Sequence, residues 1–283
     1  MKLLKTLLPA GLVAMAAAVL YAAWWQPYFF EVRRFHIGRR GSGRIIRMIH
    51  LSDLHFGEAF FSFHRRLVNH INSLEPDLLI ITGDAVDEDA EKPTGLRQFL
   101  KLLQPGIRKI AVPGNHDHKS GVAFQELQKV YEQMDVRLLI NETVKLYFPA
   151  GTLTVTGLDD MIEGNPCFIE ATKHLGTSEN HILLIHSPKH QESVLDDITE
   201  LNRNRPAERH IRLQYIFAGH NHGGQIRLPN YVPVLPLESG NYIDGWYNEQ
   251  PPYLYLSKGF GTSAVPFRWG ARPEIAVFHY HID

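Results

Sequence analysis

Short apolar runs alternate with amphipathic stretches along most of the chain. The apolar runs predict strands at residues 45–51, 78–82, 110–113, 153–157, 182–186, 215–218, 253–257 and 275–281. Helical spacing is present over residues 63–74, 94–103 and 122–134 and near residues 191–197. Helices and strands alternate in the first half and strands dominate later. This order predicts an α/β fold in which two packed sheets carry helices on the outside.

The N-terminal stretch has a different pattern. Residues 7–25 contain no charge, and as a helix they reach roughly 28 Å, the thickness of a bilayer core. Aromatic residues crowd the end of this run, as in the interfacial belt of a spanning helix. We therefore expect a membrane anchor at residues 1–30, a basic linker at 31–44 and one large domain at 45–283. The alternative is a cleaved signal peptide, because Ala14-Met15-Ala16 fits a signal peptidase.

Basic residues flank the apolar run unequally. Lys2 and Lys5 precede it, whereas six arginines follow it between Arg33 and Arg47. Positive charge favours the cytoplasmic side of a membrane. The large domain is therefore expected on the cytoplasmic face of a single-pass protein.

Composition narrows the function further. The net charge of -1 excludes a general nucleic-acid binder, which carries a basic excess. A single cysteine, Cys167, excludes an internal disulfide framework and a cysteine-based zinc cage. The 16 histidines instead suggest metal binding.

Polar clusters follow five of the predicted strands. They are Asp53-Leu54-His55, Gly83-Asp84-Ala85-Val86-Asp87, Gly114-Asn115-His116-Asp117, His186 and Gly219-His220-Asn221-His222. An α/β scaffold gathers its functional residues at the carboxyl ends of its strands. Carboxylate, imidazole and amide ligands without thiolate suit Mn²⁺, Fe or Zn²⁺. The sequence thus predicts a metal centre where these strands end. We interpret Asp87 as a supporting residue, and Asp159 and Asp160 as turn residues.

The order D-x-H, G-D-x-x-D, G-N-H-D, H and G-H-x-H resembles the calcineurin-like metallophosphoesterases over residues 44–282. The segments Asp53 to Gly57, Gly219 to Gln225, Ser257 to Thr262 and Arg272 to Glu274 resemble its membrane-anchored branch. That branch includes small bacterial phosphodiesterases and a UDP-2,3-diacylglucosamine pyrophosphohydrolase of lipid A synthesis. The resemblance implies a four-layer α/β/β/α sandwich, here behind one transmembrane helix in a bacterial inner membrane.

The resemblance also implies a ligand set for two divalent metal ions, with Mn²⁺ favoured and Zn²⁺ or Fe open. One ion would be held by Asp53, His55, Asp84 and His222, and the second by Asp84, Asn115, His186 and His220. A metal-bound hydroxide would attack phosphorus in line. His116 would then contact the phosphoryl oxygen or protonate the leaving group, with Asp117 orienting it.

The expected function is a metal-dependent phosphohydrolase that cleaves a phosphodiester or pyrophosphate bond. The expected substrate is lipid-linked and reached at membrane lipids, with UDP-2,3-diacylglucosamine as one candidate and no protein partner indicated. Phe60, Phe61 and Phe63 lie beside a ligand motif, and Arg268 or Arg272 is available for a phosphate. Alternatively, these aromatic residues only staple the following helix. A broad-specificity phosphodiesterase or phosphomonoesterase on soluble substrates and a non-catalytic metal-binding scaffold also remain open.

Overall fold

The protein is described by a computed structural model, which places residues 13, 15–39, 41, 43–176, 178–263 and 265–282. Among these residues, twelve strands form two mixed six-stranded sheets. The first has the order β1 (Glu31–Gly38), β12 (Glu274–His281), β2 (Ile45–Leu51), β3 (Leu78–Thr82), β4 (Arg108–Val112) and β5 (Val136–Leu138). The second has the order β10 (Gly245–Tyr247), β11 (Tyr253–Leu256), β9 (Tyr215–Ala218), β8 (His181–Leu184), β7 (Gly151–Gly157) and β6 (Glu142–Phe148).

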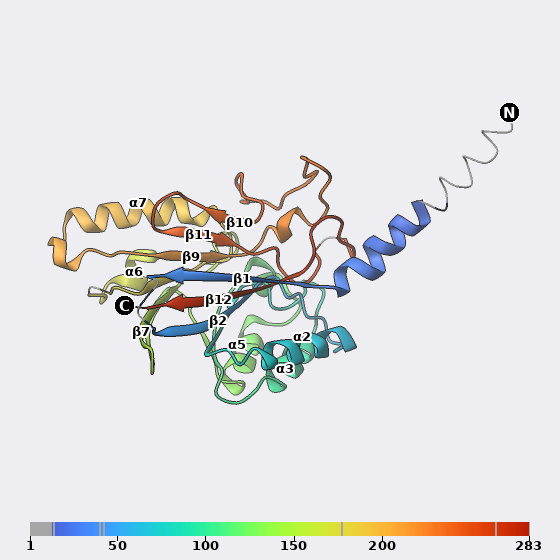
Figure 1. Cartoon of the computed structure of the whole chain (residues 1–283), viewed down its shortest axis with the longest axis horizontal. Helices are drawn as coiled ribbons and strands as arrows, with labels where there is room; N and C mark the ends of the chain where they lie inside the picture. The colour runs from blue at the N-terminus through green and yellow to red at the C-terminus, as the bar shows by residue number, and fades with distance from the viewer. Residues whose placement is uncertain are drawn as a thin grey trace.

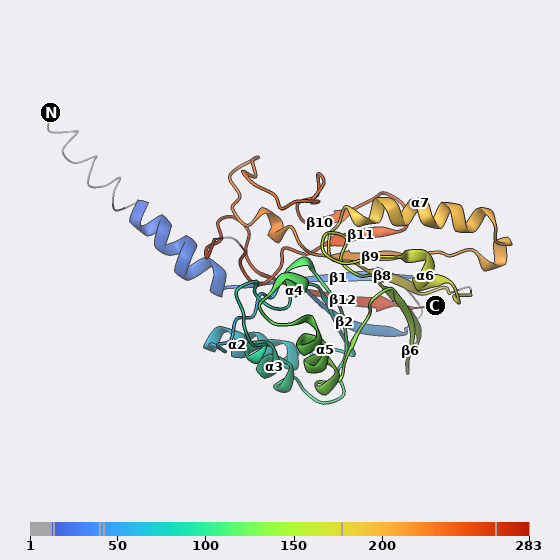
Figure 2. The ribbon, with the colours of Figure 1, turned by 180° about the vertical axis from the view of Figure 1, so that it is seen from behind.

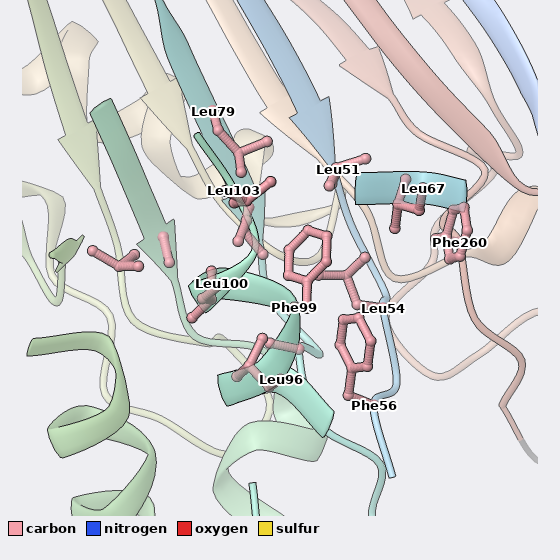
Figure 3. Packing of buried hydrophobic residues seen from close by; sticks show 14 of the residues in the cluster. Leu51, Leu54, Phe56, Leu67, Leu79, Leu96, Phe99, Leu100, Leu103 and Phe260 are labelled. Carbon is pink, nitrogen blue, oxygen red and sulfur yellow. The ribbon is translucent and has the colours of Figure 1, made fainter. Parts of the chain in front are cut away.

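Helices cover the outer faces of both sheets (Figure 1). They are α2 (Ser62–Ser73), α3 (Thr94–Lys101), α5 (Phe124–Gln133), α6 (Phe168–Thr172) and α7 (His190–Arg203), whereas the short α4 (Asn115–Lys119) follows the carboxyl end of β4. Strand residues that point outward, such as Leu79 and Ile81, pack with α2, α3 and α5 (Figure 3). Their neighbours Leu78 and Ile80 pack against the second sheet instead. The two-residue period of a strand thus explains why these runs are apolar throughout, since both faces are buried.

The predicted layer order is confirmed. One cluster of buried residues lies between the first sheet and its helices, a second lies between the sheets, and a third joins the second sheet to α6 and α7. Strands β2 to β5 are parallel, as are β7, β8, β9 and β11. Within each parallel set, all the carboxyl ends therefore meet at one edge of the sheet.

The domain starts earlier in the chain than the sequence predicted. Residues 31–38, predicted as part of a basic linker, form β1 and pair in parallel with β12 from Glu31↔Glu274 to Gly38↔His281. The strand lies at the sheet edge, where charged side chains are common because one side faces solvent. Arg33, for example, contacts Glu274 at 3.4 Å. Only residues 39–44 separate β1 from β2.

The predicted anchor lies partly outside the described residues, which begin at residue 13 and omit residue 14. Among the residues that are described, no helix is both long and apolar enough to cross a membrane. Residues 15–20 are helical and continue into η1 (Tyr21–Trp25) and η2 (Gln26–Tyr28). This segment projects from the sandwich (Figures 1 and 2), and its base contacts the C-terminal region through Ala22 O, which accepts from Arg268 N at 3.1 Å.

Candidate metal centre

The backbone itself marks the strand ends as unusual. Five of the predicted site residues have positive φ angles between 45° and 76°: Asp53, His55, Asp84, His220 and His222. Residues other than glycine rarely adopt this left-handed conformation, which costs on the order of 1–3 kcal/mol and clusters at functional sites. The surrounding fold therefore holds these side chains in place against a local conformational cost.

A first group of side chains combines residues from the loops after β2 and β9. Asp53, His55 and His222 place one ligand atom each within 4.8 Å of one another, and all three are buried. The Nε2 atoms of His55 and His222 are 3.2 Å apart, and His222 Nε2 lies 3.6 Å from Asp53 Oδ1. Two imidazoles and one carboxylate thus face a common point.

A second group combines residues from the loops after β3, β8 and β9. Asp84, His186 and His220 also place their ligand atoms within 4.8 Å of one another. His186 Nε2 lies 3.2 Å from Asp84 Oδ2, from His220 Nδ1 and from Asn115 Oδ1. The structure therefore brings all seven predicted ligands together, in the two groupings expected from the sequence motifs.

Asp84 joins the two groups. Its Oδ2 lies 3.2 Å from His186 Nε2 in the second group and 3.7 Å from His55 Nε2 in the first. Its Oδ1 accepts a hydrogen bond from the backbone N–H of His116 at 2.8 Å. This is the position that a carboxylate shared by two cations would need.

Backbone carbonyls fix the imidazoles of the second group. His186 Nδ1 donates to Thr82 O at 2.8 Å, and His220 Nε2 donates to Leu237 O at 2.6 Å. Because a carbonyl only accepts, each ring carries a proton there, and His186 Nε2 and His220 Nδ1 are the nitrogens that face the interior of the group. Such outer hydrogen bonds set the tautomer of metal-binding histidines. The second group therefore fits a divalent cation.

The charges of the site are strongly coupled. Burial raises the pKa of Asp53 to about 6, with the charge of Asp84 adding to the effect. Burial also opposes ionisation of Asp84, but His186 and His55 beside it lower the pKa of that carboxyl below its usual value. Burial lowers the pKa of His55 to about 3 and that of His220 to about 4. Burial opposes the charge of His186, but Asp84 raises the pKa of that ring well above its ordinary value. His186 must therefore give up a proton when a metal binds, since a metal ligand must be deprotonated.

His116 lies beside the two groups without belonging to either. Its Nε2 is 4.0 Å from Asp84 Oδ2 and 3.5 Å from Ser263 Oγ, and Glu88 Oε2 lies 3.5 Å from its Nδ1. The structure does not support the predicted role of Asp117 in orienting the His116 ring. Asp117 is buried and accepts hydrogen bonds from Ala85 N, Val86 N and Gly114 N at 2.8, 3.2 and 2.9 Å. Its carboxyl therefore ties the Asp84 loop to the Asn115 loop and does not orient the His116 ring.

Arg268 and Arg272 also differ from the prediction that one of them meets a phosphate. Arg268 is fully buried, and its guanidinium donates to the carbonyls of His222, Lys258, Gly261 and Ala271. Its Nη2 also lies 3.1 Å from His222 Nδ1. Arg272 donates to Phe29 O and Phe30 O. The burial of Arg268 is not visible in the sequence, whereas Arg272 is exposed as its residue type suggests.

The other acidic residues near the motifs have local roles. Asp87 Oδ1 accepts from Asp89 N at 3.4 Å. Asp160 Oδ2 accepts from Ile162 N and Glu163 N, as the turn interpretation predicted. Asp159 accepts from Asn165 N at 2.8 Å and also contacts His118 Nε2 at 2.8 Å, a pair that the sequence analysis missed.

Comparison with known proteins agrees with this geometry. A family model described as calcineurin-like phosphoesterase matches residues 46–224. The uncharacterized metallophosphoesterase YkuE of Bacillus subtilis is 27% identical, covering 96% of this chain and 92% of that protein. YkoQ of the same organism, also an uncharacterized metallophosphoesterase, is 30% identical over 83% of each chain. An uncharacterized metallophosphoesterase of Aquifex aeolicus is 28% identical over 93% of this chain and 97% of its own length.

Proposed function

From the premise that the chain belongs to the calcineurin-like phosphoesterase family and is a metal-dependent hydrolase, we propose that it cleaves a phosphodiester or pyrophosphate bond at the two side-chain groups described above. The observation that carries the proposal is the placement of Asp84 within 3.7 Å of an imidazole from each group. A carboxylate that faces both groups suits a pair of cations that act together on one phosphoryl group.

The residues that would hold the ions are Asp53, His55, Asp84 and His222 for one, and Asp84, Asn115, His186 and His220 for the other. Two divalent ions, of which we favour Mn²⁺, supply Lewis-acid polarisation of the phosphoryl oxygens and a nucleophile derived from water at neutral pH. The chain itself fixes the side chains. Asp117 holds the loops of Asp84 and Asn115 together, and Thr82 O and Leu237 O hold the rings of His186 and His220.

His116 is the residue placed to move a proton. It is only partly buried, and its Nε2 faces the space between Asp84 and Ser263. A histidine there donates a hydrogen bond to a phosphoryl oxygen or a proton to the leaving oxygen. We therefore assign His116 the role of general acid, and Asp117 the role of a residue that positions the loops.

The test is hydrolysis by the purified protein after chelation and reloading. Bis(4-nitrophenyl) phosphate, 4-nitrophenyl phosphate and a nucleoside diphosphate-linked lipid would be compared with and without added Mn²⁺. We expect the diester or the pyrophosphate to be cleaved only when metal is present, and more rapidly than the monoester. Metal-independent cleavage, or cleavage of the monoester alone, would refute the proposal.

We further propose that the substrate is lipid-linked and that the domain works at the cytoplasmic face of a bacterial inner membrane. The uncharged run at residues 7–25 and the arginines after it support this arrangement. Phe61 supports it as well, because its ring is 56% exposed on the segment between His55 and α2. Phe60 and Phe63 pack against the core beneath the helices. These two rings therefore follow the alternative interpretation, in which the aromatic residues staple the following helix.

Two measurements test the membrane proposal. Protease protection of the full chain in spheroplasts should leave the domain intact until the membrane is opened. Phe61→Ser should slow turnover of a lipid diester in micelles while leaving a soluble nitrophenyl diester unaffected. Equal rates of the variant and the wild type on the lipid would remove Phe61 from the proposal.

A further inference from the structure

An apolar pocket of about 350 Å³ opens beside the candidate metal centre, and the reaction proposed above leaves it without a role. Its apolar walls are Ile226, Pro233, Val234, Pro236 and Val265. None of the described residues that line it is an aspartate, glutamate, lysine or arginine. Such a pocket favours an apolar group over a charged one, since burial of apolar surface is favourable and an unpaired buried charge is costly.

The pocket shares residues with the site. His222, which belongs to the first group, lines it, and so does Ser263, whose Oγ lies 3.5 Å from His116 Nε2. The loop that forms the pocket also reaches the second group, because Leu237 O accepts the hydrogen bond from His220. A phosphoryl group held beside His116 would therefore have one of its substituents at the pocket.

The pocket wall is held in place by hydrogen bonds to backbone carbonyls. Trp269 N donates to Gln225 O at 2.9 Å, Arg227 N donates to Trp269 O at 2.6 Å, and Gln225 Nε2 donates to Val265 O at 2.8 Å. The same segment contacts the base of the N-terminal helix, through Arg268 N to Ala22 O. The segment that carries Val265 is therefore joined to the base of the N-terminal segment, which projects from the sandwich (Figures 1 and 2).

The loop of residues 226–237 carries several exposed apolar side chains. Leu228, Tyr231, Val234 and Leu237 are 45%, 61%, 76% and 73% exposed. Clustered exposed apolar residues mark binding surfaces more often than isolated ones do. Val234 contributes to the pocket, whereas Tyr231 lies on the same loop outside its lining.

We propose that this pocket binds an alkyl chain carried by one ester arm of the substrate. The inference rests on the proposed phosphodiesterase function and adds the chemical class of the substituent. The volume suits one chain or a comparably small apolar group. It places one alkyl arm of the substrate on the Ser263 and His222 side of the site.

The experiment uses alkyl 4-nitrophenyl phosphodiesters from methyl to dodecyl, below their micelle concentrations, with the metal-loaded full chain. For the wild type, kcat/KM should rise with chain length by up to about fourfold per methylene, which corresponds to about 0.8 kcal/mol, and then level off. Val234→Asp should lower kcat/KM for the octyl ester by tenfold or more and leave kcat/KM for the methyl ester unchanged. Tyr231→Asp is the matched control and should behave like the wild type.

The outcomes separate the two proposals. If the methyl ester is cleaved but kcat/KM does not depend on chain length, the pocket assignment fails and the phosphodiesterase function stands. Equal losses in Val234→Asp and Tyr231→Asp would also overturn the assignment, because they would point to a general surface effect of the loop. If no ester is cleaved, the proposed function fails. Calorimetric binding of alkyl phosphonates to the metal-loaded chain then decides the pocket, since affinity independent of chain length would refute it.

Discussion

The two side-chain groups contain similar donors but differ in how their imidazoles are held. In the second group, His186 and His220 each donate one proton to a backbone carbonyl, so the other nitrogen of each ring faces the interior of the group. In the first group, His55 Nδ1 is buried with no hydrogen-bond partner among the described residues. His222 Nδ1 faces the guanidinium of Arg268 at 3.1 Å.

The contact with Arg268 has a consequence for the first group. Arginine only donates, so His222 Nδ1 must accept, and a neutral ring then carries its proton on Nε2. That nitrogen is the one that faces His55 and Asp53. A cation entering the first group must therefore displace this proton or turn the ring. The carbonyl partners already orient both rings of the second group toward a cation, whereas His222 in the first group is turned by Arg268, so we expect the two sites to differ in affinity.

The largest loss of activity and of bound metal should follow substitution of Asp84, the residue that the two groups share. Asp84→Ala removes a carboxylate that faces both groups and also leaves His116 N without its acceptor. We expect hydrolysis to disappear and bound metal, measured by mass spectrometry, to fall in both sites. Asp87→Ala is the control and should keep metal and activity, because Asp87 lies outside both groups. An Asp84→Ala variant that still holds one ion at full affinity would contradict the shared role.

A large loss of rate without loss of metal should follow from His116→Ala. His116 contributes no atom to either group, so both ions should remain bound. General acid catalysis accounts for about 10²–10⁴ in rate, and kcat should fall by that factor for an alkyl leaving group. A nitrophenyl leaving group needs no proton and should lose less. Equal losses on both substrates would argue against proton donation by His116.

The sequence predicted the site better than its surroundings. The parallel strands end at common edges, which predicted a metal centre there, and the resemblance to the family implied which side chains meet. Strand β1 was missed because the charged pattern of an edge strand resembles that of a linker. Arg268 and Asp117 were misread because their partners are mostly backbone groups from distant loops, which leave no signal in residue type.

A smaller difference, in metal affinity between the two groups, is tested directly by stepwise metal loading. Second-sphere hydrogen bonds of the kind made by His186 and His220 change metal affinity by about 10–100-fold. Titration of the chelated protein with Mn²⁺, followed by electron paramagnetic resonance, should show one ion bound before a second that couples to it. Simultaneous loading with equal affinity would remove the distinction between the groups.

The smallest predicted effect is on the stability of the metal-free protein. It comes from His118 and Asp159, an ion pair that lies outside both groups. The hydrogen bond to Asp159 raises the pKa of His118 above its ordinary value of 6.5. The pKa of Asp159 is lowered from 3.8, because the bonds from His118 and Asn165 N outweigh burial. The histidine contribution is fully present below pH 6.5 and is lost as pH rises through the folded-state pKa. The aspartate contribution is present above pH 3.8 and is lost as pH falls through its own folded-state pKa.

The pair therefore stabilises most between about pH 4 and 6.5. Because both side chains are partly exposed, His118→Asn should cost about 1 kcal/mol or less there and less still at pH 9. Urea unfolding in the presence of a chelator at pH 5.5 and pH 9 measures the difference. A cost that is the same at both values would mean that the pair acts by packing and not by charge. The pH dependence of the metal-free protein would then have to come from the two groups themselves.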